Sequence, residues 1–293
     1  MSSTAPIDEA APATTLAELR ARLDDLDTAI HDLLMQRADV VGEVAQLAAS
    51  RGKIAFRPGR EAQIIRRLLA RHAGGLPRQA LPRLWRELLA ATTAMQGAFV
   101  IAVCEPAPGT GYAACAREHF GALTPLRAHT SPARAIAEVS AGLATAAVLP
   151  MPQEEEPAAT AWWATLLHRD EPRIHVVARL PFWAPRPEGA PQVQALVVAA
   201  APPDPSGRDR SLLGFDLSAE ISRARLSAAC TAAGLAPAAM ILRRDPAAQE
   251  AQGLVEVEGY VTEDDPRLAA LADHAGRSTV LGAYAVPVGG DAP

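Results

Sequence analysis

A long run of apolar residues at helical spacing stands near the start of this 293-residue chain and restricts how that part can fold. Between Thr15 and about Ser50 they recur at alternating steps of three and four, at Leu16, Leu19, Leu23, Leu26, Ile30, Leu33, Val40, Val44 and Leu47. The spacing predicts one helix about 50 Å long with a heptad-like seam. Such a helix cannot bury its seam on its own short segment, so we expect a partner helix from a second copy of the chain.

Two shorter helical patterns follow, and they complete a three-helix unit over residues 15–97. The second helix is expected to begin near Pro58 and to end before Gly74. The third is expected to run from about Pro77 to Gln96, with Leu81, Leu84, Trp85, Leu88 and Leu89 on its apolar face.

The remainder of the chain alternates short strand patterns with helical ones. This alternation predicts an α/β lobe over 98–205, ending in the proline-rich linker 201–207. Residues 206–289 have the order βαββαβ, which is the ferredoxin-like pattern. With a flexible tail at 1–14, the fold class is a multidomain α plus α/β protein.

Composition and charge exclude several classes of function. The net charge is −5 and aromatic residues make up only 4%, which argues against a nucleic-acid partner. The lack of an apolar run of about 18 residues argues against a membrane span, and the acidic first residues do not resemble a signal peptide. The chain is therefore expected to be cytoplasmic, with its three cysteines reduced. Its histidines and cysteines show no metal-ligand spacing, so neither a metal nor another cofactor is expected.

Polar residues interrupt or flank the apolar stripes of the three predicted helices: Arg20, Arg37, Arg60, Glu61, Thr92 and Gln96. A buried arginine is costly without an anionic partner, so something negative must face Arg37. One interpretation is a salt bridge that sets helix register. The other is a pocket inside the bundle, lined by arginines and an amide, that suits a small dianion. Such a pocket holds no nucleophile, so its chemistry would depend on positioning and electrostatic stabilisation.

The segments Leu19–Asp27, Leu33–Arg37 and Arg57–Ala62 resemble the all-helical chorismate mutases. They are most similar to the N-terminal domain of the bifunctional chorismate mutase–prephenate dehydratases, over residues 15–97 without a gap. The resemblance implies an intertwined homodimer that rearranges chorismate to prephenate. It also implies that Arg20 of the partner chain and Arg37 clamp the substrate carboxylates, that Arg60 lies near them, and that Thr92 lines the pocket.

The residues that the resemblance places near the reacting atoms include one departure from the family pattern. Glu61 would hydrogen-bond the ring hydroxyl, and Gln96 would donate to the ether oxygen whose bond breaks. The family has a lysine as a second donor to that oxygen, and Ala48 stands at its position. Loss of such a donor should cost on the order of 3 kcal/mol. Arg51, or less directly Lys53, is expected to reach back and replace it.

The α/β lobe resembles a reduced prephenate dehydratase domain. Pro106–Tyr112 is similar to the start of that domain, and Val148–Gln153 is similar to its Pro-x-Glu-Asn turn. The family's Thr-Arg-Phe signature is replaced by Gln194–Leu196, and the stretch between the motifs is short. The resemblance therefore implies that dehydratase activity is lost.

The C-terminal unit resembles an ACT regulatory domain. Leu254–Gly259 and Val280–Tyr284 carry the likeness. The two segments that form the phenylalanine site in that family read Glu220–Arg223 and Ile241–Arg244 here, and neither keeps the family's sequence. A different ligand and a purely structural role both remain open for this unit.

Two functions of different class follow from the sequence. The first is a chorismate mutase of phenylalanine and tyrosine biosynthesis, favoured by the retained Arg20, Arg37, Arg60, Glu61 and Gln96. The alternative is a catalytically impaired protein that binds chorismate or prephenate and regulates or scaffolds the same pathway. Ala48 favours this alternative.

Overall fold

The computed structural model describes residues 14–49, 56–157, 160–168, 170–184, 186–245, 250–275 and 278–289. The chain divides into two compact units, one up to residue 53 and one from residue 54. We call them the helical unit and the sheet unit and describe each by itself. Across the described ranges, no helix is long and apolar enough to cross a membrane.

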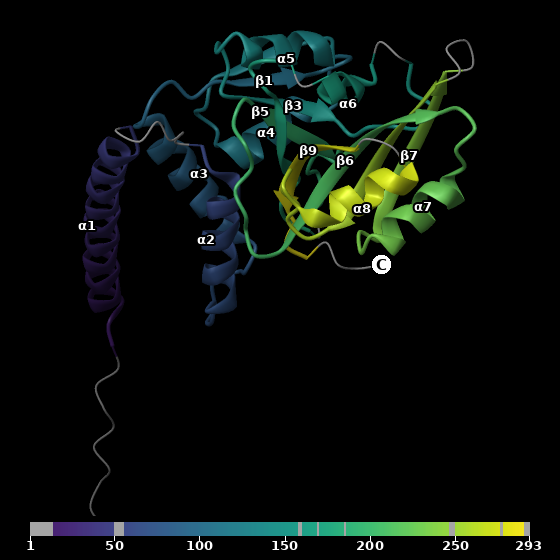
Figure 1. Ribbon diagram of the computed structural model, residues 1–293. Coiled ribbons are helices and arrows are strands. Elements are labelled where there is room, and N and C mark those ends of the chain that lie inside the picture. The colour runs from purple at the N-terminus through teal and green to yellow at the C-terminus, as the bar shows by residue number, and fades with distance from the viewer. Residues whose placement is uncertain are drawn as a thin grey trace, which may run out of the picture. The chain divides into compact units, whose positions relative to one another are not determined.

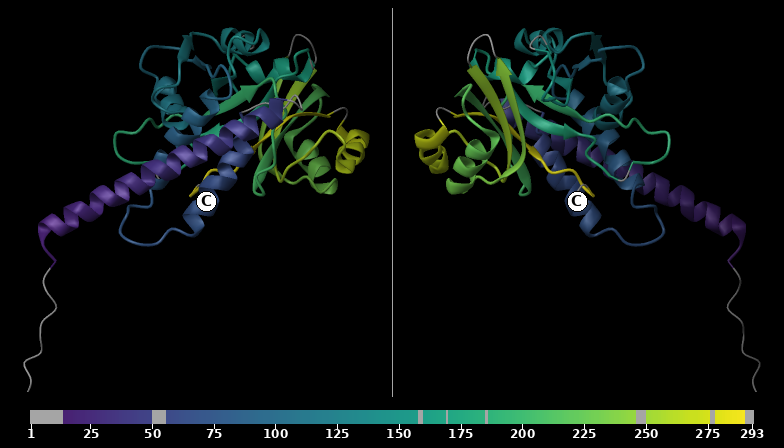
Figure 2. Two further views of the ribbon diagram at one scale, coloured as in Figure 1. Left: turned by 90° about the vertical axis from the view of Figure 1, so that its left-hand side faces the viewer. Right: turned by 90° about the vertical axis from the view of Figure 1, so that its right-hand side faces the viewer.

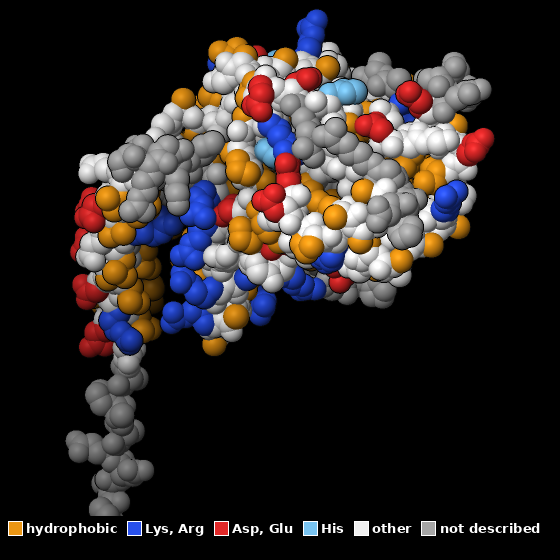
Figure 3. All heavy atoms as spheres, viewed as in Figure 1, with side chains coloured by type: hydrophobic (Ala, Val, Ile, Leu, Met, Phe, Trp, Pro, Cys, Tyr) orange, Lys and Arg blue, Asp and Glu red, His pale blue; other side chains and the backbone are white. Residues whose placement is uncertain are grey.

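The helical unit is the single helix α1 (Leu16–Ala49), which spans 34 residues as the apolar spacing predicts. Its first turn is held by a capping box, in which the Thr15 amide donates to Glu18 Oε2 at 2.7 Å and the Glu18 amide donates to Thr15 Oγ1 at 3.2 Å. Apolar side chains run along α1 (Figure 3), and they are exposed, with Leu33 at 63%. The apolar seam, for which we expected a partner helix, is therefore exposed in the single chain.

The sheet unit is built on one nine-stranded sheet with the order β2-β1-β3-β5-β4-β9-β6-β8-β7 (Figure 1). Its strands are β1 (Ile101–Cys104), β2 (Leu126–His129), β3 (Ala146–Pro150), β4 (His175–Leu180), β5 (Ala195–Ala199), β6 (Asp209–Ser218), β7 (Pro237–Asp245), β8 (Glu250–Glu258) and β9 (Ser278–Ala285).

The first half of the sheet forms the predicted α/β arrangement. Strands β2, β1 and β3 are parallel, and β5 and β4 continue the sheet in antiparallel pairings. Helices α4 (Tyr112–Phe120) and α5 (Pro132–Ser140) connect the parallel strands, and the short α6 (Trp162–Thr165) and a 3-10 turn (Leu166–His168) precede β4. The sequence reading missed β2, because this half-exposed edge strand has no apolar run to indicate it.

The second half has the element order β6, α7 (Arg223–Ala232), β7, β8, α8 (Pro266–Ala275) and β9, as the βαββαβ pattern predicts. Helix α7 begins at Arg223 because Ser222 Oγ caps it by accepting from the Arg225 amide at 3.1 Å. The halves join where β4 runs parallel to β9, at the pair Val176 and Gly282. A Cβ at residue 282 would lie 2.1 Å from the Val176 carbonyl oxygen, so the joint requires glycine.

Helices α2 (Pro58–Ala70) and α3 (Ala80–Ala94) belong to the sheet unit and form a hairpin that packs on the sheet. Figure 2 shows them across the second half of the sheet from α7 and α8. Ile65, Leu69 and Leu89 share a buried cluster with Phe182 and Ala285. The second and third predicted helices are therefore confirmed, and they share a core with the C-terminal half of the chain.

The predicted linker 201–207 holds the start of α2. The Asp204 carboxylate accepts hydrogen bonds from the Gly59 and Arg60 amides at 3.0 and 2.9 Å, and the Arg66 guanidinium donates to the Ser206 carbonyl oxygen at 3.3 Å. A carboxylate at a helix N-terminus is favoured by the unpaired amides and the helix dipole. The domain boundaries predicted after residues 14, 97 and 205 stay predictions.

Candidate functional site

A buried ion pair joins the two helices of the α2–α3 hairpin. Arg86 Nη1 donates to Glu61 Oε2 at 2.7 Å, and the two side chains are only 6% and 13% exposed. The Arg86 guanidinium also lies 5.0 Å from the centre of the Phe182 ring, within the range of a cation–π contact. Burial raises the pKa of Glu61 and lowers the pKa of Arg86, and each partner opposes the shift of the other.

This pair sets the orientation of a predicted site residue. Among the described residues, Glu61 accepts a hydrogen bond only at Oε2, from Arg86. Its other carboxylate oxygen accepts none there, so one acceptor stays available to a ligand hydroxyl. Arg86 therefore fixes one oxygen of the Glu61 carboxylate within the hairpin.

Arg60, one residue earlier on α2, lies on the exposed side of the helix. Its amide donates to Asp204 Oδ2, and its Nη1 donates to Gln63 Oε1 at 3.2 Å. Arg60 and Glu61 are thus neighbours in sequence that differ sharply in burial. The exposed Arg60 guanidinium can bind the anionic group of a ligand.

Thr92 lies in the last turn of α3, and Gln96 follows just after the helix ends at Ala94. Thr92 is buried, and its hydroxyl donates to the Leu88 carbonyl oxygen at 2.9 Å. Gln96 is half-buried, and its Nε2 donates to the Thr92 carbonyl oxygen at 3.1 Å. A primary amide carries two hydrogens, so Gln96 can still donate one of them to a ligand.

The other predicted site residues lie on α1, in the helical unit. Arg20 is exposed and Arg37 is half-buried, and burial lowers the pKa of Arg37. The two are seventeen residues apart on one helix, which separates their Cα atoms by about 25 Å. One small substrate cannot be clamped by both from the same chain. Arg51 and Lys53 lie outside the described residues.

The structure therefore divides the predicted residues into two sets. Arg60, Glu61, Thr92 and Gln96 belong to one hairpin of the sheet unit, and Arg20 and Arg37 belong to α1. The described part of the chain contains no group of three histidine, cysteine or acidic residues suited to a metal ion.

Sequence reasoning missed Arg86, although a signal for it was present. The same argument that singled out Arg37 applies to an arginine between Leu81 and Leu89 on α3. The predicted stripe was correct at Leu81 and Leu89, which are buried, but it included Leu84, which is 57% exposed, and omitted the buried Arg86. Pro82 and Arg86 lie on the buried face of α3 together with Leu81 and Leu89.

Comparison with known proteins supports the resemblance seen in the N-terminal part. The family model described as Chorismate mutase type II matches residues 19–97. The chain is 31% identical over 175 residues to the bifunctional chorismate mutase/prephenate dehydratase of Stutzerimonas stutzeri, covering 56% of this chain and 48% of that protein. It is 30% identical over 175 residues to the bifunctional enzyme of Pseudomonas aeruginosa, covering 55% and 47%. The chain thus spans about half the length of the curated relatives it matches, and its predicted likeness to this family is confirmed.

Solved structures show more distant similarity. A protein described as GqqA, a novel type of quorum quenching acylase, is 19% identical with a TM-score of 0.48, covering 64% of this chain and 96% of that one. The prephenate dehydratase of Arthrobacter aurescens in complex with L-Phe is 14% identical with a TM-score of 0.45, covering 64% and 90%.

Proposed function

We propose that this protein is a chorismate mutase of aromatic amino acid biosynthesis, acting as a cytoplasmic homodimer that converts chorismate to prephenate. The observation that carries the proposal is the match of residues 19–97 to the chorismate mutase type II family model. That segment contains the predicted site residues Arg20, Arg37, Arg51, Arg60, Glu61, Thr92 and Gln96.

The proposed mechanism needs only positioning and electrostatic stabilisation. Chorismate is a dianion that rearranges within itself, so no nucleophile, metal or other cofactor takes part. Arg37 and the partner chain's Arg20 bind its carboxylates, with Arg60 near them, and hold the reactive conformer. Fixed donors at the breaking ether bond then stabilise the charge that develops in the transition state.

Glu61 and Gln96 are the two proposed catalytic residues on the hairpin. Arg86 fixes one oxygen of Glu61 and leaves the other for the ring hydroxyl. Gln96 donates its second amide hydrogen to the ether oxygen. Since Ala48 occupies the position of the usual lysine, we propose that Arg51 supplies the remaining donor.

The homodimer is supported by two features of α1. Its apolar seam is exposed along the whole helix, from Leu16 at 63% to Leu47 at 64%. The distance of about 25 Å between Arg20 and Arg37 also requires the clamp to draw on two chains. Exposed apolar surface of this extent on one helix is typical of an interface.

The dimer is tested by charge substitutions on α1. Leu26→Glu places a charge on the seam and should shift the protein to monomer in sedimentation velocity. Thr28→Glu is the matched control, because residue 28 lies about 200° around the helix from residue 26. Equal sedimentation of both variants and the parent chain would contradict the proposed interface.

The activity is tested by following the loss of chorismate absorbance with the purified chain and with Arg37→Ala. We expect steady turnover that falls by about a hundredfold or more in the variant. Arg51→Ala and Lys53→Ala then identify the replacement donor, and an unchanged rate in both would reject the idea of rescue. We expect no formation of phenylpyruvate from prephenate. Its detection would mean that the chain also has dehydratase activity.

The alternative function is a regulatory or scaffold protein that binds chorismate or prephenate without converting them. Ala48 is the observation that favours it, since the family's lysine donor is missing. The distinguishing result is tight binding of a bicyclic transition-state mimic with no turnover of chorismate. For residues 206–289 we propose an ACT-like domain whose ligand, if it has one, differs from phenylalanine.

A further inference from the structure

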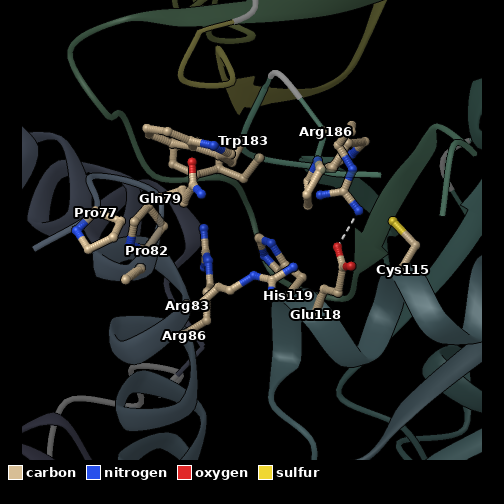
Figure 4. Close-up of a pocket in the computed structure, with 14 residues that line it drawn as sticks. Pro77, Gln79, Pro82, Arg83, Arg86, Cys115, Glu118, His119, Trp183 and Arg186 are labelled. Carbon is tan, nitrogen blue, oxygen red and sulfur yellow. Dashed lines mark hydrogen bonds and ion pairs between the residues drawn. The ribbon is translucent and has the colours of Figure 1, made fainter. Parts of the chain in front are cut away.

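A cavity lies within the sheet unit, and none of the predicted mutase residues lines it. It has a volume of about 470 Å³ and lies between α3, α4 and the segment that follows β4 (Figure 4). Pro82, Phe182 and Trp183 supply apolar and aromatic walls, and Arg83, Arg86 and Arg186 supply guanidinium groups. This volume, and a lining that combines apolar, aromatic and charged side chains, are typical of a small-molecule site.

The charges around the cavity leave one positive charge uncompensated. Arg86 is paired with Glu61, and Arg186 is paired with Glu118. Arg83 is exposed and has no ion-pair partner among the described residues. His119 is only 7% exposed, and burial together with the nearby Arg86 lowers its pKa well below its usual value, so the ring is neutral at pH 7. A ligand with a single negative charge would balance this surplus.

Two buried polar atoms in the cavity wall have no hydrogen-bond partner within the described part of the chain. They are His119 Nε2 and Arg186 Nε. Figure 4 shows His119 beside Arg83 and Arg86, facing the hollow, with Trp183 on the opposite side. Buried polar groups are almost always paired in folded proteins, because an unpaired one costs about 1–3 kcal/mol. A polar ligand group in the cavity would satisfy them.

We propose that this cavity binds a small aromatic monocarboxylate. Arg83 and His119 hold the carboxylate, and the ring lies against Trp183 and Phe182. A guanidinium fork matches a carboxylate in shape, which favours this group over an uncharged amide. The prolines and aromatic side chains of the wall favour a flat apolar body over a sugar or a polyol.

The same site is connected to the proposed mutase site through one side chain. Arg86 lines the cavity, and its Nη1 holds Glu61 Oε2 at 2.7 Å. A carboxylate bound in the cavity competes with Glu61 for the Arg86 guanidinium and so shifts the proposed catalytic carboxylate. Occupation of the cavity is therefore expected to lower the rate of chorismate turnover. This coupling rests on the proposed function, whereas ligand binding does not.

Binding is tested on the full chain by isothermal titration calorimetry with three probes of similar shape: phenylacetate, its neutral analogue phenylacetamide and the cation phenethylamine. We expect phenylacetate to bind with a dissociation constant below about 1 mM and at least about tenfold more tightly than the other two. Equal binding of all three, or no binding of phenylacetate, would overturn the proposal.

Variants locate the binding to the cavity. Arg83→Gln should weaken phenylacetate binding by about tenfold or more. Arg78→Gln is the matched control, because this exposed arginine lies near the same end of α3 and does not line the cavity. Trp183→Ala should weaken all three probes together, since it removes the aromatic wall. An unchanged affinity in Arg83→Gln would reject the assigned carboxylate position.

Coupling is tested by the ratio of chorismate turnover with and without saturating phenylacetate. We expect a reduced ratio in the parent chain and in Arg78→Gln, and a ratio near one in Arg83→Gln at the same concentration. A ratio of one in the parent chain would overturn the coupling while binding stands. Absence of turnover in every sample would overturn the proposed function and the coupling with it. Calorimetry would still test whether phenylacetate binds in the cavity.

Discussion

Replacing Arg86 by leucine tests how the buried ion pair contributes to the fold. The variant leaves the Glu61 carboxylate buried without its partner. Removing one member of a buried pair typically costs about 3–5 kcal/mol, because the remaining charge stays desolvated. The free energy of unfolding at pH 8 should fall by about that amount. The assay is urea unfolding followed by tryptophan fluorescence, since Trp85 and Trp183 pack on the same cluster as Ile65 and Leu89.

The pH dependence of this variant has a definite sign. In the parent chain, burial raises the pKa of Glu61, and the Asp204 charge raises it too, whereas Arg86 lowers it. Without Arg86 the pKa of Glu61 rises further above its unfolded value. The folded state then binds a proton more readily than the unfolded state, so its stability falls as pH rises through the folded pKa. The destabilisation should therefore be smaller at pH 5 than at pH 8.

Two controls separate the ion pair from general damage to the helix. Arg83→Leu changes an exposed arginine one turn earlier on α3 and should alter the unfolding free energy by less than about 0.5 kcal/mol. The double variant Glu61→Leu with Arg86→Leu removes both charges and should recover most of the lost stability. The reasoning would be refuted if Arg86→Leu cost less than about 1 kcal/mol at pH 8, or if its cost grew on acidification.

Three further predictions concern the rest of the sheet unit. Asp204→Ala removes the acceptor for two α2 amides and should cost about 1–2 kcal/mol in urea unfolding, with Asp204→Asn intermediate. Gly282→Ala drives a Cβ into the β4 backbone and should cost more than about 3 kcal/mol, whereas Gly259→Ala, with a positive φ but open space, should cost about 1 kcal/mol. The buried thiols of Cys104, Cys115 and Cys230 should stay unreactive to Ellman's reagent at pH 8 until urea unfolds the chain. Burial raises the pKa of each thiol to about 11, and reaction of the folded chain would contradict this.

Periodic patterns made most of the secondary structure predictable. The seam of α1, the hairpin helices and the βαββαβ order all follow from residues that repeat at 3.6 or 2 positions. The edge strand β2 was missed because its sequence, Leu126–His129, is half-exposed and mixed in polarity. Such a strand forms by pairing with β1, and local sequence does not encode that partner.

The candidate site was only partly predictable for the same reason. The polar positions on the helical stripes could be found from spacing, and the resemblance supplied their expected roles. The contact between Glu61 and Arg86 depends on the rotation of α3 about its axis, which is set by packing on Phe182 and Ala285. Those residues are about a hundred and two hundred positions further along the chain, where no helical pattern points to them.

The shared core beneath α2 and α3 limits how a chain like this one can be recombined. Segments that correspond to separate activities are often treated as independent domains that can be exchanged between proteins. A cut after Gly97 would strip Ile65, Leu69 and Leu89 of the apolar surface that Phe182 and Ala285 provide. The helical hairpin and the sheet must therefore be inherited and altered together, and a change fixed in one half restricts which changes the other half can accept.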